Sequence, residues 1–482
     1  MTKKAENKET FYSTCQECKG QGKIKNKIRK SVRLRYLAAL KEFEKSKQEG
    51  AAPVRPIPHQ SLCKKCNGTG LIATDNRPIA DNKTYPHVAI IGAGIGGVAL
   101  AVACLHRQIP FTIYERDKTF EDRAQGYGLT LQQATKALTG LGISNLKEAI
   151  ISTRHVVHNT EGKILGEWGM KKWQNESTKK SPKRTNMLIA RQALRNALLK
   201  QLGGKDIVKW GYQLVDFKEN EGVELRFLVD GEIRNEKAQL VVGADGIRST
   251  VRKIVIGDEL TPLRYLGCIV ILGICPLADI KSNSSLLNSE TIFQTANGND
   301  RIYIMPLDEH SVMWQFSFPI SENEAKELSA KGAKALKEET CRRTQWHEPV
   351  PQILSATDEN LIIGYPVYDR ALLNEDFMKN CGCATLIGDA AHPMSPFKGQ
   401  GANQALLDAL ALAREISKGC RPSSPWREVG LRKYVLTEYE AKMIERSASK
   451  VKDSAEAAMI LHSEIILREA NEPRGKALKN KI

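Results

Sequence analysis

Short apolar runs are separated by turns and helical patterns in the part of the chain that follows residue 85. The run His87–Ile91 leads into a glycine-rich turn and then into an apolar stretch, Val98–Leu105, which is long enough for a short helix. A second short run, Phe111–Glu115, follows. This order of strand, tight turn, helix and strand predicts an α/β unit with a parallel sheet.

A different pattern extends from about Leu263 to Pro319. Three short runs rich in β-branched and aromatic residues, Cys268–Leu272, Arg301–Met305 and Val312–Phe318, have the composition of strands and predict a sheet-rich lobe. Helical spacing returns in the segment from Leu431 to about Glu469 and predicts a C-terminal helix. The chain therefore combines a parallel α/β domain with a second lobe made mainly of strands.

The N-terminal segment has its own pattern. Apolar residues recur at helical spacing from Ile28 to Phe43 within a Lys/Arg-rich stretch, residues 23–47, and predict an amphipathic helix. A proline-rich run, Ala52–Pro58, and a polar run, Thr74–Tyr85, predict linkers.

The formal net charge is +17, but it is unevenly distributed. Residues 1–86 contain 19 Lys and Arg against 8 Asp and Glu, which leaves 53 basic and 47 acidic residues for the rest of the chain. A basic helix face can contact nucleic acid or an acidic protein, and it can equally be a solvated surface. Because no apolar run approaches the roughly 20 residues that span a bilayer, we expect no transmembrane helix. The polar start has no signal-peptide pattern, so we expect a cytoplasmic location with reduced cysteines.

Two copies of one motif, Cys-x-x-Cys-x-Gly-x-Gly, begin at Cys15 and Cys63. Each copy places two thiolates on one turn, so two copies make a tetrahedral zinc site. The predicted ligands are Cys15, Cys18, Cys63 and Cys66. The motif resembles the zinc domain of the J-domain co-chaperones. We expect structural zinc, because four thiolates leave no open coordination position.

The turn after the first apolar run has the spacing of a dinucleotide-binding fingerprint. Gly92 permits the turn, Gly94 lets the backbone approach a pyrophosphate, and Gly97 permits close packing of the helix. Glu115, at the end of the second strand, is placed to bind ribose hydroxyls. Two further glycine motifs follow along the chain, at Gly243-Ala-Asp-Gly246 and at Gly388–Asn403.

These motifs together resemble those of the class A flavoprotein monooxygenases, which include para-hydroxybenzoate hydroxylase and the tetracycline-inactivating monooxygenases. The resemblance covers about residues 86–440. It implies that further residues bind FAD, namely Arg116, Arg191, Asp245, Asp389, Pro396, Gly399, Gly401, Ala402 and Asn403. Asp245 would equally suit a cap on the following turn. His392 could be a catalytic base or a packing residue, and we assign no catalytic side chain.

The fold class implied is α/β, with a Rossmann-like FAD-binding domain interleaved with a sheet-rich substrate domain, a small N-terminal zinc module and a C-terminal helix. The expected boundaries are 1–84 for the zinc module, 85–262 and 366–430 for the two parts of the FAD-binding domain, 263–365 for the substrate sheet and 431–482 for the C-terminal helix. Part of the substrate lobe is expected to be inserted within 85–262.

The resemblance implies that NAD(P)H reduces FAD, that O2 forms a C4a-hydroperoxide, and that one oxygen atom is transferred to an aromatic or polycyclic small molecule, with tetracyclines among the candidates. Two alternatives stay open. One is a binding or regulatory zinc protein with a redox-sensing or vestigial flavin domain, and the other is a flavin-dependent reductase.

Overall fold

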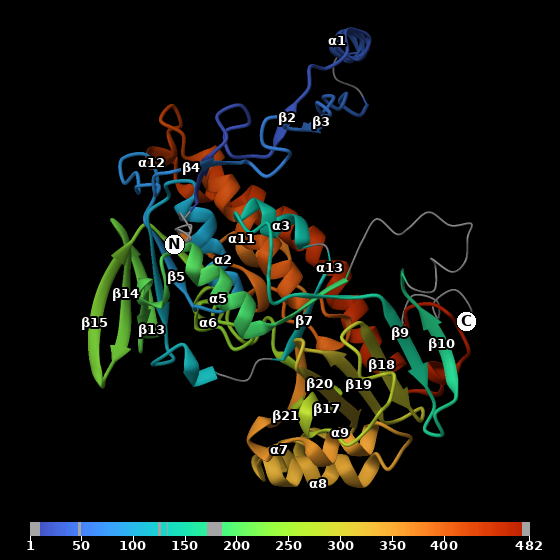
Figure 1. Cartoon of the computed structure of the whole chain (residues 1–482). Helices are drawn as coiled ribbons and strands as arrows, with labels where there is room; N and C mark the ends of the chain where they lie inside the picture. The colour runs from blue at the N-terminus through green and yellow to red at the C-terminus, as the bar shows by residue number, and fades with distance from the viewer. Residues whose placement is uncertain (1–9, 47–49, 124–126, 133, 171–185, 475–482) are drawn as a thin grey trace, which may run out of the picture. The chain divides into compact units, whose positions relative to one another are not determined.

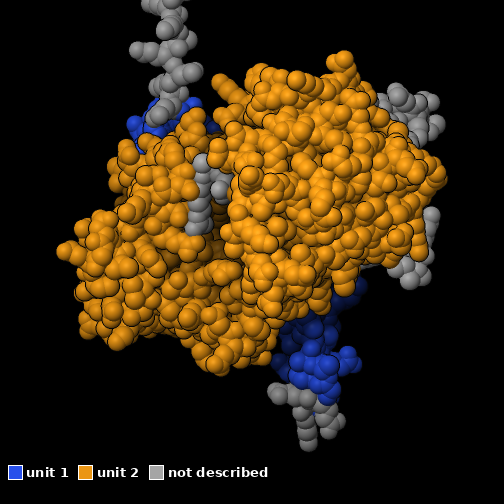
Figure 2. Space-filling view, turned by 90° about the horizontal axis from the view of Figure 1, so that it is seen from below, with its two compact units in different colours: residues 1–78 blue, residues 79–482 orange. Residues whose placement is uncertain are grey.

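The computed structural model describes residues 10–46, 50–123, 127–132, 134–170 and 186–474. The chain divides into two compact units, residues 1–78 and residues 79–482 (Figures 1 and 2). The ends of the predicted N-terminal helix and of the predicted C-terminal domain, at residues 47 and 475–482, lie outside the described residues.

The described residues of the first unit form two small antiparallel sheets and one helix. Strand β1 (Phe11–Thr14) pairs with β4 (Leu71–Thr74), and β2 (Lys23–Lys25) pairs with β3 (Gln60–Leu62). Helix α1 (Lys30–Lys45) lies between β2 and β3 in the sequence. The predicted helix therefore begins later than expected, because its first residues pair as a strand.

The second unit contains a five-stranded sheet in the order β12-β6-β5-β16-β22, in which all neighbours are parallel. Its strands are β5 (Val88–Ile91), β6 (Phe111–Glu115), β12 (Val208–Trp210), β16 (Leu240–Gly243) and β22 (Ala384–Leu386). Strands β5 and β16 are buried along their whole length, as expected for a parallel sheet that is covered on both faces.

Helix α2 (Ile95–Leu105) follows β5 and packs against both α5 (Arg191–Gln201) and α11 (Gly401–Gly419). A separate antiparallel sheet contains β13 (Gln213–Asn220), β14 (Gly222–Val229) and β15 (Glu232–Ala238). Alternate residues of β14 are buried, and Phe227 stacks on Tyr114 of β6 with ring centroids 4.3 Å apart. The α/β prediction for this part of the chain is confirmed.

The sheet-rich lobe is a seven-stranded mixed sheet in the order β10-β9-β18-β19-β20-β17-β21. Its strands are β9 (Arg154–His158), β10 (Ile164–Trp168), β17 (Leu263–Pro276), β18 (Thr291–Ala296), β19 (Arg301–Pro306), β20 (Ser311–Pro319) and β21 (Ile362–Arg370). Helices α7 (Glu322–Ala330), α8 (Ala333–Arg343) and α9 (Val350–Ala356) cover one face of this sheet (Figure 1). The opposite face is available to build a site.

A fourth sheet of this unit has the order β7-β11-β8 and contains β7 (Gly128–Leu131), β8 (Ile150–Ser152) and β11 (Asn186–Ala190). The described part of this unit also contains four shorter helices: α3 (Thr135–Gly140), α6 (Thr250–Val255), α10 (Glu375–Met378) and α12 (Trp426–Val429). Helix α13 (Thr437–Ile460) is the long C-terminal helix. The chain then reaches β10, where the Ala470 N–H donates to the Leu165 carbonyl at 3.0 Å. Within the described ranges, no helix combines the length and apolar character needed to cross a membrane.

Candidate active site and metal centre

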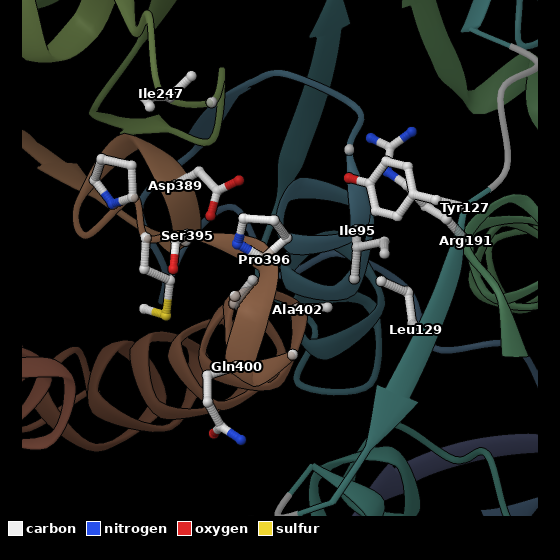
Figure 3. Close-up of a pocket in the computed structure, with 18 of the residues that line it drawn as sticks. Ile95, Tyr127, Leu129, Arg191, Ile247, Asp389, Ser395, Pro396, Gln400 and Ala402 are labelled. Atoms are coloured by element: carbon white, nitrogen blue, oxygen red, sulfur yellow. The ribbon is translucent and has the colours of Figure 1, made fainter. Parts of the chain in front are cut away.

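A cavity of about 1290 Å³ in the second unit is lined by both of its larger sheets and by the loops between them (Figure 3). The glycine loop after β5, the turn after β16 and the segment before α11 form one part of its wall. Strands β18, β19 and β20 form another part. Of the residues predicted to bind FAD, all except Gly97 and Asn403 line this cavity.

The glycine loop has little room for side chains at two of its three glycines. A Cβ on Gly92, which has φ +106°, would lie 2.5 Å from the Ala244 carbonyl oxygen, and one on Gly97 would lie 1.9 Å from the Gly92 oxygen. Gly94 differs, because the nearest atom to its Cβ position is Nη2 of Arg191 at 4.0 Å. The loop therefore leaves an open space between the start of α2 and a guanidinium, which suits an anion.

Glu115 lies at the end of β6 and is only 8% exposed. Its two carboxylate oxygens accept the backbone N–H groups of Ala93 at 2.8 Å and of Asp117 at 3.2 Å. Each carboxylate oxygen has a second lone pair, so the group can still accept a hydroxyl. The neighbouring Arg116 is exposed and also lines the cavity.

Two arginines project from the first turns of α5. Arg191 is the first helical residue, and its guanidinium lies 5.7 Å from the ring centroid of Tyr127. Arg195 is buried and donates from Nε to the Ala93 carbonyl at 2.7 Å, so it braces the glycine loop. We did not predict Arg195 from the sequence. Its position four residues after Arg191, on the same helix face, is the signal that could have indicated it.

Figure 3 shows Asp389 and Pro396 on one side of the cavity, with Tyr127 and Arg191 on the other. Asp389 follows Gly388, and its carboxylate is exposed to the cavity rather than paired within the core. It can therefore accept hydrogen bonds from the hydroxyls of a ligand.

Asp245 has the geometry of a turn cap as well as a place in the cavity wall. One of its oxygens accepts the Ser249 hydroxyl at 2.5 Å, and the other accepts the Thr250 N–H at 2.7 Å. The Thr250 N–H lies at the start of α6, where backbone N–H groups have no acceptor within the helix, and Asp245 provides one. These hydrogen bonds match the alternative interpretation of the sequence, in which Asp245 caps the turn that follows β16.

The Asn403 side chain is fully buried and joins two segments of backbone. Its oxygen accepts the N–H groups of Gln132 at 2.9 Å and Ala134 at 3.2 Å, and its nitrogen donates to the carbonyls of Thr130 at 2.9 Å and Gly399 at 2.8 Å. Asn403 therefore fixes the loop before α11 against β7.

His392 lies outside the cavity wall and is 5% exposed. Its Nε2 is 2.7 Å from Oδ2 of Asp408, which also accepts the Gly388 N–H at 2.8 Å. The second Asp408 oxygen contacts Arg446. This buried network matches the interpretation of His392 as a packing residue rather than as a catalytic base.

Arg301 is a cavity residue that our sequence analysis did not identify as part of the site. It lies on β19, is 5% exposed, and donates from Nε to the Gln294 oxygen at 2.7 Å. Its guanidinium lies 5.1 Å from the ring centroid of Tyr303. Burial lowers its pKa to about 10, so it remains charged at neutral pH. Among the residues that the structure describes, none accepts a hydrogen bond from its two Nη groups.

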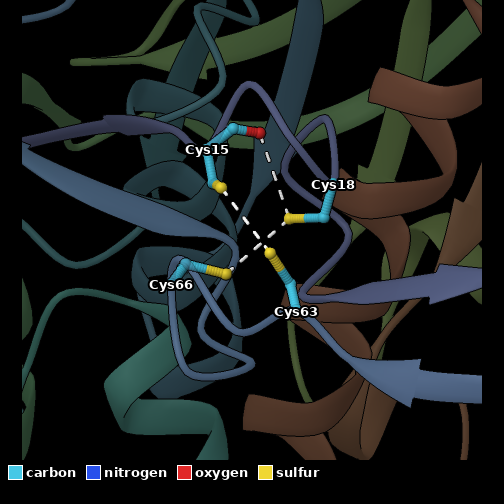
Figure 4. A group of neighbouring side chains, drawn as sticks. All are labelled: Cys15, Cys18, Cys63 and Cys66. Carbon is cyan, nitrogen blue, oxygen red and sulfur yellow. Dashed lines mark hydrogen bonds between the residues drawn. The ribbon is translucent and has the colours of Figure 1, made fainter.

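The four predicted zinc ligands meet in the first unit (Figure 4). The Sγ atoms of Cys15 and Cys63 are 3.9 Å apart, those of Cys18 and Cys66 are 3.7 Å apart, and all four lie within 4.8 Å of one another. A tetrahedral zinc ion with Zn–S bonds of ~2.3 Å requires S···S separations of about 3.8 Å. The donor set and its spacing therefore fit zinc.

The two motifs have the same local geometry and hold each other in place. The Gly22 N–H donates to Cys18 Sγ, and the Gly70 N–H donates to Cys66 Sγ, both at 3.2 Å. Across the centre, the Cys15 N–H donates to the Gly70 carbonyl at 2.8 Å, and the Cys63 N–H donates to the Gly22 carbonyl at 3.0 Å. Such N–H···S contacts stabilise the thiolate form that a metal requires.

Comparison with known proteins supports the cavity as a flavin site. The FAD binding domain family matches residues 85–426. The chain is 30% identical to aurachin C monooxygenase/isomerase of Stigmatella aurantiaca over 338 residues, which are 70% of this chain and 82% of the relative. The structure of 2,6-dihydroxypyridine-3-hydroxylase from Arthrobacter nicotinovorans is similar with a TM-score of 0.68 and 17% identity, over 82% of this chain and 96% of that one. Tetracycline destructase Tet(51) is similar with a TM-score of 0.56 and 19% identity, over 84% and 96%.

Proposed function

Because this chain belongs to the FAD-binding family of class A flavin-dependent monooxygenases, we propose that it hydroxylates an aromatic small molecule that carries an acidic group. NAD(P)H is the proposed reductant and O2 the proposed oxidant. Within the substrate class we include phenols, aromatic carboxylic acids and acidic polycycles such as tetracyclines. The observation that carries the substrate class is the charged guanidinium of Arg301, whose Nη groups have no acceptor within the described part of the chain.

The residues of the cavity fit FAD. In our proposal the open space at Gly94, with Arg191 beside it, receives the pyrophosphate, since a helix start and a guanidinium both favour phosphate oxygens. Glu115 receives the hydroxyls of the adenosine ribose, and Asp389 receives those of the ribityl chain. When bound, FAD supplies the electron-transfer and oxygen-transfer chemistry.

The flavin ring is proposed to lie against the segment Pro396–Ala402, which leads into the 19-residue helix α11. Amide groups at the start of a long helix stabilise negative charge, and Gly399 and Gly401 leave the backbone accessible. Gly399 adopts φ +58°, a conformation that favours glycine. These features support a role for this segment in holding the flavin ring of FAD, where its amide groups would stabilise negative charge.

The cavity has room for a second ligand. Its volume exceeds the ~300 to 1000 Å³ of most single small-molecule sites. The wall beyond Arg301 contains Met305, Met313 and Leu272, which are suited to the apolar faces of an aromatic ring and exclude water from it. In this arrangement Arg301 orients the substrate through its acidic group while the apolar wall holds the ring.

The test is NADPH oxidation by the purified holoenzyme, alone and with 4-hydroxybenzoate, salicylate, 2,6-dihydroxypyridine or tetracycline, followed by mass spectrometry. We expect at least one acidic compound to stimulate oxidation and to gain about 16 mass units, the mass of one oxygen atom. NADPH oxidation with formation of a reduced organic product and no oxygen gain would instead favour the reductase alternative. Absence of bound flavin in the purified protein would contradict the proposal.

A further inference from the structure

The insert between the two cysteine motifs is not used by the proposed reaction. Its ends are held together, because Lys23–Lys25 of β2 pair with Gln60–Leu62 of β3 and the Asn26 N–H donates to the His59 carbonyl at 2.9 Å. The four-cysteine centre lies directly beyond this pairing in both directions along the chain. We call residues 26–46 and 50–59 the docking arm.

Helix α1 of the docking arm has no buried residue. Its main apolar row, Val32, Tyr36, Leu40 and Phe43, is half-buried. A second row contains Lys30, Leu34, Leu37, Lys41 and Lys45, all exposed and spaced by three or four residues, so they share one face of the helix. Leu34 is 55% exposed and Leu37 is 48% exposed. Two aliphatic side chains therefore stand between lysines on an uncovered face.

The segment after α1 exposes two more aliphatic residues, Val54 and Ile57, each 88% exposed. Three prolines, at 53, 56 and 58, fix their own φ angles and restrict the residues before them to extended backbone. A chain of this kind has about three residues per turn, which places Val54 and Ile57 on the same side. Their exposure is thus imposed by a stiff backbone.

The docking arm is strongly basic. Its described residues include eight Lys and Arg and two Asp and Glu. The basic residues are Lys27, Arg29, Lys30, Arg33, Arg35, Lys41, Lys45 and Arg55, and the acidic ones are Glu42 and Glu44. Any partner of this surface must therefore be acidic and must also accept exposed aliphatic side chains.

We propose that the docking arm binds the surface of an anionic lipid bilayer. Basic amphipathic helices lie in the lipid interface with apolar side chains inserted, and Lys and Arg side chains near the membrane are attracted to an anionic surface. The row from Lys30 to Lys45 suits this arrangement, because long lysine side chains reach the headgroups while Leu34 and Leu37 enter the acyl region.

Two other partners fit these observations less well. Nucleic-acid surfaces are contacted mainly by polar and charged groups, with aromatic side chains for base stacking, whereas the exposed apolar residues here are aliphatic and Tyr36 and Phe43 are half-buried. A protein interface has an apolar centre from which charge is depleted, whereas lysines lie within the aliphatic row of α1. These differences favour lipid.

The experiment is co-sedimentation of the full-length holoprotein with vesicles of equimolar phosphatidylglycerol and phosphatidylcholine, and with vesicles of phosphatidylcholine alone. We expect binding only to the anionic vesicles and a large loss of binding between about 0.05 M and about 0.5 M salt, because salt screens the charges. The L34E/L37E double variant should lower the bound fraction at least tenfold. The matched control is I233E/L260E, which alters two exposed aliphatic residues of the second unit and should bind as the parent does.

Zinc content and flavin absorbance of each variant show whether it is folded, and NADPH oxidation in solution should be unchanged. Equal sedimentation with both vesicle types would overturn the proposal, as would parental binding by L34E/L37E. Retention of polyuridylate on filters that is lost in L34E/L37E, without sedimentation on anionic vesicles, would also overturn it and assign the arm to nucleic acid. Because none of these readouts requires turnover, the result is independent of the proposed substrate.

Discussion

The two units of this chain are held together by different means. Among its described residues, the second unit has four clusters of buried apolar side chains, and the largest of them extends over the parallel sheet and its helices. The buried cluster of the first unit consists of the four cysteines, with Ile24 and Ile72 packed against it. We therefore expect the first unit to depend on a metal bound by these cysteines for its stability. The proposed flavin site, by contrast, is built on a scaffold with a large apolar core.

Loss of the metal should produce the largest difference between the units. We expect the C18S variant, or chelation of zinc, to unfold residues 10–78 cooperatively, because structural zinc contributes about 10 kcal/mol or more to such modules. The second unit should keep its flavin. Limited proteolysis followed by mass spectrometry, with flavin absorbance measured in parallel, checks both statements. Release of flavin on chelation would show that the units are not independent.

Acid should destabilise the second unit through buried histidines. Burial lowers the pKa of His106 to about 3 and that of His158 to about 4, while both titrate near 6.5 in the unfolded chain. Between these pKa values and 6.5, the two histidines bind protons only in the unfolded state. Their contribution to the free energy of unfolding is therefore complete above pH 6.5 and is lost as the pH falls below it. The free energy of unfolding is expected to fall by about 1.4 kcal/mol per pH unit for each histidine.

The free energy of unfolding, measured by denaturant titration at several pH values, tests this expectation. In the H158Q variant the free energy of unfolding should change less steeply between pH 6 and pH 4.5, because one titrating imidazole is removed. An unchanged slope would show that His158 does not contribute.

Two glycine variants separate folding from cofactor binding within the second unit. G97A places a Cβ 1.9 Å from a backbone oxygen and should lower stability by about 1 to 3 kcal/mol or more. G94A has no atom closer than 4.0 Å to its new Cβ, so it should keep the parent's melting temperature and bind flavin more weakly. Thermal denaturation and fluorescence titration with FAD distinguish the two effects. Equal melting temperatures for the two variants would contradict this interpretation.

The smallest expected effect is on substrate selection. R301Q should raise KM about tenfold or more for an acidic substrate, because a hydrogen bond to a charged group contributes about 1.5 to 3 kcal/mol. It should leave flavin binding and the KM of a neutral analogue nearly unchanged. The control is R264Q, which removes a partner of Asp369 at the side of β17. Steady-state kinetics over the substrate panel provide the measurement.

The two units also differ in how much of each could be predicted. The zinc ligands and the residues of the glycine loop lie in short motifs, in which the spacing alone fixes the geometry. The α/β fold and the substrate sheet followed from hydrophobic patterns of adjacent residues. The late start of α1 was missed because Lys23–Lys25 pair with a strand that lies far along the chain.

Arg301 was missed for a similar physical reason. Its meaning depends on which face of β19 points toward the cavity, and this is set by pairing with β18 and β20 rather than by its own neighbours. His392 and Asp245 show the opposite case, in which the sequence indicates the position of a residue but not the role of its side chain. Each lies within a flavin motif, yet their hydrogen bonds are to Asp408 and to the start of α6. A motif indicates where a residue lies more reliably than it indicates what its side chain does.

The pairing of the two cysteine motifs has a consequence for sequence change over evolution. Because the motifs satisfy each other's backbone groups, the length of chain between Cys18 and Cys63 is not constrained by the centre itself. Doubling the length of a flexible loop costs only about 0.6 kcal/mol of closure entropy. One insert between the two motifs can therefore be exchanged for another without loss of the fold around the four-cysteine centre.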